Sequence, residues 1–243
     1  MNLCIDIGNS LIKTAIFDCS EIIETIVNKT ISVSFFSRLK SKYSIDRVIL
    51  SSVRKANTKM TGELQKLFPD FLELNNDTPL PFENCYKTPD TLGRDRLAAI
   101  AGAGNIFPGS HVLVIDAGTA ITYDLITAGK KYLGGNISPG LNMRFRALNR
   151  FTDNLPFVSP KTGFEMIGRD TEEAISIGVL QGIFFEMEQY IRKFSDNYPG
   201  LKVILTGGDA HFFEKELKND IFVVANLILL GLNSILKYNV KKS

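Results

Sequence analysis

The chain carries one short pattern twice: an acidic residue, then a glycine two positions later, then a small polar residue. The copies occupy residues 6–10 and 116–120, and each stands between two apolar runs. Apolar runs on both sides of a glycine turn predict a strand, a tight loop and a second strand. Because the unit occurs in both halves of the chain, it constrains the fold to a duplicated α/β arrangement.

The residue types in these turns are those of a phosphate site that also holds a cation. Glycine lets the backbone come close to a ligand, and Asn9 and Thr119 add hydrogen-bonding groups after Gly8 and Gly118. A carboxylate in each turn would repel a bare phosphate, so a cation between them is expected. Lys13 follows the first turn and could reach terminal phosphate oxygens. The turns therefore predict a metal-nucleotide ligand.

Other nucleotide motifs are absent from the sequence. No G-x-x-x-x-G-K-[ST] occurs and no G-x-G-x-x-G follows a strand, so the P-loop and dinucleotide interpretations lose their main support. Ordinary hairpin chemistry remains an alternative for each Asp-x-Gly turn taken singly.

The order of predicted elements divides the chain into two α/β domains, residues 1–111 and 112–243, with a ligand cleft between them. In the first domain we expect strands at 2–6, 11–18, 21–27 and 47–52, helices at 33–42, 58–68 and 97–106, and a loop at 75–91. In the second we expect strands at 112–115, 121–126, 131–137 and 202–206, and helices at 141–151, 171–194 and 226–237.

Composition excludes several classes of protein. With 28 basic and 26 acidic residues the net charge is only +2, which gives no electrostatic case for nucleic acid or an anionic membrane. The 3 cysteines lack C-x-x-C spacing, which argues against a disulfide framework or a zinc site. A predicted strand occupies the start of the chain, so no signal peptide is expected, and the apolar run at 221–236 is interrupted by Asn226 and Asn233. We expect a soluble cytoplasmic protein.

A second constellation, Gly93-Arg94-Asp95-Arg96, stands where the proline-containing loop meets the alanine-rich helix. Asp95 could simply cap the helix and pair with Arg96. In the functional interpretation an arginine binds a substrate carboxylate while Asp95 accepts a proton from a substrate hydroxyl. The motif alone leaves both open.

Three further turns have equally open interpretations. Residues 134–140 end a strand and open a helix, so their N–H groups could approach a ligand. Thr171 is either a helix cap or a substrate contact, and the glycine pair in 206–209 could lie against a flat base or form a plain turn. His111 and His211 show no metal or nucleophile spacing and receive no role.

Together the motifs resemble the type III pantothenate kinases, members of the superfamily of actin, the large heat-shock chaperones and the sugar kinases. The resemblance rests on five motifs in the family's order: 6–10 with Lys13, 86–96, 116–124, 134–140, and Thr171 before Ala174 and Gly178. It implies two duplicated actin-like, ribonuclease H-like domains with an interdomain cleft. It also implies a homodimer with part of the substrate site supplied across the interface.

The resemblance assigns roles by position. The residues that would bind ATP are Asp6, Ile7, Gly8, Asn9, Ser10, Leu11, Ile12, Lys13 and Thr119. The residues that would bind pantothenate are Tyr86, Gly93, Arg94, Asp95, Arg96 and Thr171, with Asp95 as the proton acceptor. Asp116 would bind a monovalent cation, K⁺ or NH₄⁺, and Asp6 a divalent ion, Mg²⁺, directly or through water. Asn226 replaces the acidic residue usual before the last helix, which puts C-terminal nucleotide contacts in doubt.

The expected reaction is ATP-dependent phosphorylation of pantothenate to 4'-phosphopantothenate, the first step of coenzyme A biosynthesis. One alternative is another small-molecule kinase or a phosphohydrolase of the superfamily, which would share the phosphate turns but not the 86–96 segment. A non-catalytic regulator of the same fold is the other.

Overall fold

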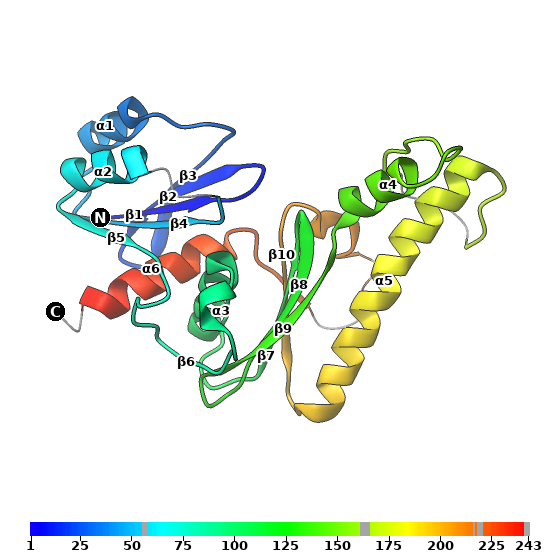
Figure 1. The fold of residues 1–243 in the computed structure, drawn as a ribbon. Coiled ribbons are helices and arrows are strands. Elements are labelled where there is room, and N and C mark those ends of the chain that lie inside the picture. The colour runs from blue at the N-terminus through cyan, green and yellow to red at the C-terminus, as the bar shows by residue number, and fades with distance from the viewer. Residues whose placement is uncertain (55–57, 161–165, 216, 218–220, 241–243) are drawn as a thin grey trace. The chain divides into compact units, whose positions relative to one another are not determined.

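The structure is a computed structural model that describes residues 1–54, 58–160, 166–215, 217 and 221–240 (Figure 1). The chain forms two compact units. The first comprises Met1–Pro108, Gly129–Leu133 and Asn226–Ser243, and the second comprises Gly109–Ala128 and Gly134–Ala225.

The first unit is built on a five-stranded mixed sheet in the order β3-β2-β1-β4-β5. Its strands are β1 (Asn2–Ile7), β2 (Ile12–Asp18), β3 (Glu21–Asn28), β4 (Arg47–Ser52) and β5 (Asp70–Glu73). The first three form an antiparallel meander, β4 adds in parallel beside β1, and β5 adds in parallel beside β4. Parallel addition requires a crossover helix, and α1 (Val33–Lys42) and α2 (Thr58–Leu67) supply the two crossovers.

Helices cover both faces of this sheet (Figure 1). On one face the side chains of Leu3, Ile5 and Ile7 form a core with Phe36 of α1 and Leu64 of α2. The other face packs against α3 (Arg94–Ile106) and α6 (Leu227–Val240). Because side chains alternate along a strand, residues next to those core positions point toward α3 and α6.

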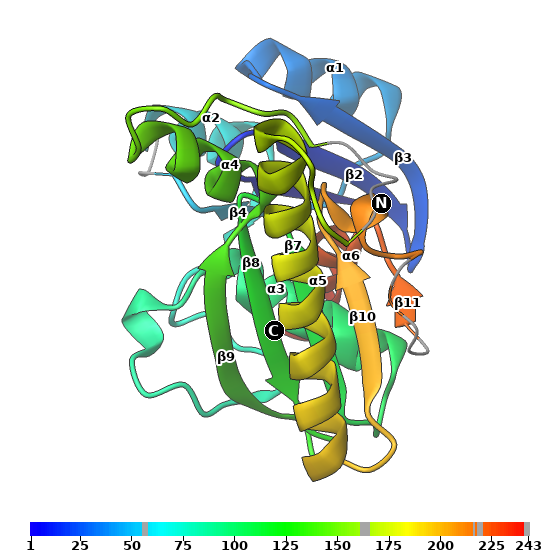
Figure 2. The same cartoon turned by 90° about the vertical axis from the view of Figure 1, so that its right-hand side faces the viewer.

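The second sheet has six strands in the order β11-β10-β7-β8-β9-β6 and forms most of the second unit, although β6 and residues 131–133 of β9 belong to the first unit. Its strands are β6 (Glu83–Asn84), β7 (Val112–Ala117), β8 (Ala120–Ile126), β9 (Lys131–Pro139), β10 (Lys202–Thr206) and β11 (Ile221–Val223). The helices of this unit are α4 (Leu141–Arg150) and the long α5 (Thr171–Asn197), which lies over the sheet in Figure 2. Its core joins Leu113, Ile115 and Leu205 of the sheet to Ile183 and Met187 of α5.

The grouping of the last helix differs from the predicted domains 1–111 and 112–243. Residues from Asn226 onward belong to the first unit because α6 packs closely on α3. The crossing is made by two glycines: a Cβ on Gly231 would overlap the carbonyl oxygen of Ala98, and a Cβ on Gly102 would lie 2.6 Å from the carbonyl oxygen of Leu227. Backbone contact of this kind allows no side chain at either position.

The predicted strands and helices are present with differences at their ends, and the short strands β6 and β11 were not predicted. Helix α3 begins at Arg94, whereas the sequence predicted a start at residue 97, because its first turn is polar and carries Asp95. An acidic residue in a first turn stabilises a helix without contributing to its apolar pattern. The predicted loop 75–91 contains the short strand β6 and a 3₁₀ turn at Pro89–Thr91. Within the described residues, no helix is long and apolar enough to cross a bilayer.

Candidate active site

The first acidic turn joins β1 to β2. Asp6 lies directly opposite Lys13 in the antiparallel register, and the N–H of Gly8 donates to the carbonyl oxygen of Leu11 over 3.0 Å. Residues directly opposite each other share a face of the sheet, so the carboxylate and the ammonium group lie on the face toward α3 and α6. Asp6 is 6% exposed and Lys13 is half-buried, whereas Asn9 at the tip is exposed.

The other residues of this turn that were predicted to bind the nucleotide fall into two groups. Ile7 and Ile12 are buried in the apolar core on the opposite face, so they could offer a ligand only backbone groups. Ser10 and Leu11 are exposed with Asn9 at the tip. The tip of the turn therefore presents the polar side chains of Asn9 and Ser10 together with backbone N–H groups.

Strand β4 places a serine beside Asp6. Ser51 pairs in register with Asp6, is fully buried, and its hydroxyl has no hydrogen-bond partner among the described residues. A buried hydroxyl without a partner costs about 1–3 kcal/mol, which a water molecule or ligand would offset. A carboxylate with a neighbouring hydroxyl is an oxygen donor set, and Mg²⁺ prefers oxygen ligands. The residues present thus fit a divalent ion or its water at Asp6.

The second acidic turn joins β7 to β8 in the same way. The N–H of Gly118 donates to the carbonyl oxygen of Ala120 over 3.1 Å, and Asp116, opposite Thr122, is half-buried. Thr119 at the tip is exposed. The two turns therefore share their local geometry as well as their sequence.

Two more glycines pack closely against the backbone of this second turn. A Cβ on Gly207 would lie 2.6 Å from the Asp116 Oδ1 atom and would overlap the carbonyl oxygen of Ala117. Gly207 also has a φ of +99°, which favours glycine. A Cβ on Gly140, the residue before α4, would overlap the carbonyl oxygens of Gly118 and Thr119. The turn at 116–120 is thus enclosed by backbone, with oxygen atoms suited to a weakly hydrated cation beside Asp116.

The glycine pair in 206–209 therefore has a structural role at the second turn, and base stacking there stays a prediction. The N–H of Asp209 donates to the carbonyl oxygen of Ala117 over 2.9 Å. Burial raises the pKa of the Asp209 carboxyl, an effect that His211 partly opposes.

Asp95 is not the cap of α3. The N-cap is Gly93, and Asp95 lies in the first turn, where its Oδ1 accepts from the N–H of Arg96 over 2.9 Å. A carboxylate here is stabilised by the positive end of the helix dipole. Asp95 is half-buried, and its Oδ1 would lie 2.5 Å from a Cβ on Gly93, which explains the glycine.

The two arginines of this motif have different surroundings. Arg96 is 6% exposed, and its guanidinium carbon lies 5.5 Å from the centre of the Tyr86 ring. Arg94 instead forms an ion pair with Glu73 over 3.5 Å. Tyr86 also stacks on Tyr132, with ring centres 6.2 Å apart and planes within 10°. Arg96 and Tyr86 thus lie in contact. The sequence analysis missed Tyr132, which stacks on Tyr86, and Glu73, which pairs with Arg94.

Thr171 is the first residue of α5 and is exposed. The cap is Asp170, whose side chain accepts from the N–H of Glu173 over 2.9 Å. The capping interpretation of Thr171 is therefore wrong, and its substrate contact stays a prediction.

Strand β9 continues through 134–140 into α4, as the sequence predicted, and is held by a polar network. The Glu186 carboxylate of α5 accepts from Tyr123, Ser138 and Arg144, over 2.9, 3.1 and 2.6 Å. This network joins β8, β9, α4 and α5. In the described part of the chain, no three or more His, Cys, Asp or Glu side chains cluster in a way that could hold a metal ion.

Solved structures show the class of fold. A putative Baf family transcriptional activator from Campylobacter jejuni superposes with a TM-score of 0.65 at 22% identity, covering 98% of this chain and 99% of that one. A putative N-acetylmannosamine kinase from Listeria monocytogenes superposes with a TM-score of 0.56 at 12% identity, with the same coverage. The fold is therefore that of the actin-like α/β proteins, with two mixed sheets.

Sequence comparison then narrows the class. Residues 2–193 match the family description Type III pantothenate kinase. A type III pantothenate kinase from Phocaeicola vulgatus is 50% identical over 241 residues, which cover 99% of this chain and 100% of that protein. The chain belongs to the type III pantothenate kinase family, which confirms the resemblance drawn from the motifs.

Proposed function

We propose that this type III pantothenate kinase transfers the γ-phosphoryl group of ATP to the primary hydroxyl of pantothenate, giving 4'-phosphopantothenate for coenzyme A biosynthesis. The observation that carries the proposal is the start of α3. There a half-buried carboxylate, Asp95, is next to a buried arginine, Arg96, which is fixed against the Tyr86 ring.

Each acidic turn offers groups suited to the phosphates of a nucleotide. The N–H groups of Asn9 and Ser10 at the first tip are donors for phosphate oxygens, and the half-buried Lys13 neutralises the terminal phosphate. Asp6 holds Mg²⁺ directly or through water, with Ser51 beside it. Thr119 contributes from the exposed tip of the second turn.

Asp116 binds K⁺ or NH₄⁺ next to the second turn. Its carboxylate is half-buried within backbone that Gly140 and Gly207 allow to come close. When bound, the two cations offset the charge that develops on the phosphate oxygens.

Pantothenate binds at the start of α3. The Arg96 guanidinium pairs with the substrate carboxylate, and Tyr86 supplies the neighbouring wall. The substrate hydroxyl gives its proton to Asp95 as its oxygen forms a bond to the γ-phosphorus. The bond between that phosphorus and the β–γ bridging oxygen breaks, and ADP leaves with the electron pair.

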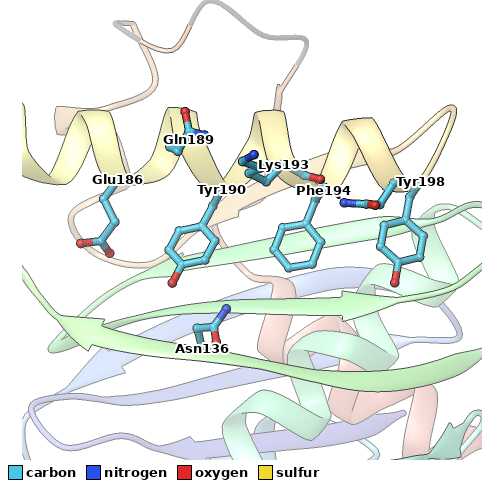
Figure 3. A pocket seen from close by; sticks show the side chains of 8 residues that line it. Asn136, Glu186, Gln189, Tyr190, Lys193, Phe194 and Tyr198 are labelled. Carbon is cyan, nitrogen blue, oxygen red and sulfur yellow. Dashed lines mark hydrogen bonds between the residues drawn. The ribbon is translucent and has the colours of Figure 1, made fainter.

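A homodimer completes the pantothenate site by supplying part of it across the interface. Thr171, at the start of α5, is a further pantothenate contact. Support for the homodimer comes from an open pocket of about 750 Å³ along α5 (Figure 3). Three rings in a row, from Tyr190 and Phe194 of α5 and from Tyr198 just after it, line this pocket together with Asn136 of β9. Half-buried aromatic rings in a row are the composition of protein interfaces. Phe194→Lys should halve the mass measured by light scattering, while Ile23→Lys, at a 48% exposed position on β3, should leave it unchanged.

The direct test is an assay of purified protein with ATP, Mg²⁺, pantothenate and either K⁺ or Na⁺. We expect phosphorylated pantothenate, formed faster in K⁺, and Asp116→Asn should weaken that preference. No product at any K⁺ or NH₄⁺ concentration would overturn the kinase proposal and favour a regulatory role. Phosphorylation of other small hydroxylated compounds but not of pantothenate would point to the other alternative.

A further inference from the structure

Arg54, two residues beyond β4, forms hydrogen bonds with the first acidic turn. Its Nε donates to the carbonyl oxygen of Gly8 over 2.8 Å, and its Nη2 donates to the carbonyl oxygen of Asn9 over 3.1 Å. The fork of one guanidinium thus holds two consecutive peptide groups of the turn proposed to bind ATP phosphates. We propose that Arg54 is a positioning residue for the nucleotide, an inference that rests on the proposed function.

The Arg54 side chain contacts the turn from the face of the sheet opposite to Asp6 and Lys13. A pocket of about 260 Å³ in the first unit is lined by Arg54 together with Ile7, Ile12 and Leu50. These three side chains belong to the core that packs on α1 and α2. Alternation along β1 and β2 turns Asp6 and Lys13 to the other face.

The position of the carbonyl oxygens decides where the N–H groups point. In a trans peptide the C=O and the N–H of the same plane point in opposite directions, and no peptide in the described residues is cis. Because Arg54 draws the carbonyls of Gly8 and Asn9 toward itself, the N–H groups of Asn9 and Ser10 point away from it. They are thereby directed to the side where Asp6 and Lys13 lie.

These two N–H groups are available for a ligand. Within the described part of the chain neither Asn9 nor Ser10 donates its N–H to another protein group, and both residues are exposed. The turn's own hydrogen bond uses only the N–H of Gly8. Arg54 also keeps its own place, since its N–H donates to the Ser52 hydroxyl over 3.2 Å and its carbonyl accepts from that hydroxyl. The turn is therefore set before the nucleotide arrives, which lowers the ordering cost of binding.

The experiment measures ATP affinity by isothermal titration calorimetry in the absence of pantothenate, beside steady-state kinetics. Arg54→Ala should raise the Kd and the KM for ATP about tenfold, as expected for two hydrogen bonds that order a turn, and leave the KM for pantothenate unchanged. Arg54→Lys separates geometry from charge, because an ammonium group keeps the charge but cannot hold two carbonyls as a fork. We expect the increase in log Kd for ATP in Arg54→Lys to be more than half of the increase in Arg54→Ala.

The matched control is Arg38→Ala on α1, which removes one exposed arginine elsewhere in the same unit and should change neither constant. Melting temperatures without nucleotide identify a variant that fails to fold, in which case Arg54→Lys alone decides. An ATP Kd within twofold of wild type in Arg54→Ala, or full recovery by Lys, would overturn the inference while leaving the kinase intact. A wild-type protein that neither binds ATP nor turns over would instead overturn the proposed function.

Discussion

Replacing Gly207 with alanine should damage both the stability of the second unit and the cation site proposed at Asp116. The residue has a φ of +99°, where an L side chain costs about 1–2 kcal/mol. The added Cβ would lie 2.6 Å from Asp116 Oδ1 and overlap the carbonyl oxygen of Ala117, and crowding of this kind costs about 1–3 kcal/mol. The two effects together lower the free energy of unfolding by about 2–5 kcal/mol, a large part of the roughly 5–15 kcal/mol typical of a whole protein.

Gly208 provides the control because it is adjacent, exposed, and has open space where its Cβ would stand. Urea unfolding of both alanine variants measures the stability difference, and a K⁺ titration of activity measures the cation site. We expect Gly207→Ala to need a higher K⁺ concentration for half-maximal activity, since Asp116 must move, and Gly208→Ala to match wild type in both assays. Equal unfolding free energies and equal K⁺ dependence for the two variants would refute the argument that Gly207 shapes the turn.

Three further changes test other parts of the molecule. Asp95→Asn should leave pantothenate affinity nearly unchanged and lower kcat by about 10²- to 10⁴-fold; a kcat within a few-fold of wild type would remove Asp95 from the proton path. Gly231→Ala should lower the free energy of unfolding by more than about 2 kcal/mol, because its Cβ would overlap the Ala98 carbonyl oxygen. Gly62 of α2 has open space around it, so Gly62→Ala should raise the free energy of unfolding by about 0.5–1 kcal/mol in the same urea assay. Asp209→Asn should stabilise the protein at pH 7, because burial raises the pKa of this carboxyl and its ionised form is disfavoured in the folded state. That gain should disappear below about pH 4, where the wild-type carboxyl is protonated in both states, and a gain independent of pH would contradict this account.

Local patterns in the sequence were sufficient for the helices, the longer strands and the two acidic turns, but not for the short strands β6 and β11. Antiparallel strands joined by a four-residue connection must pair, so the proximity of Asp6 and Lys13 followed from the first turn alone. The order of the motifs was also sufficient to predict the family, because motif spacing is a property of the chain itself. The fold class and the kinase family were predicted in this way.

Tertiary structure decided which distant segments support those motifs. Arg54 contacts Gly8 across 46 residues because β4 adds in parallel beside β1, a pairing that strand patterns do not specify. Gly207 reaches Asp116 because β10 pairs with β7. Helix α6 joins the first unit because Gly231 lets it approach α3. Hydrophobic periodicity reports which face of an element is buried but not against which partner, and that choice depends on sheet order and packing over the whole chain.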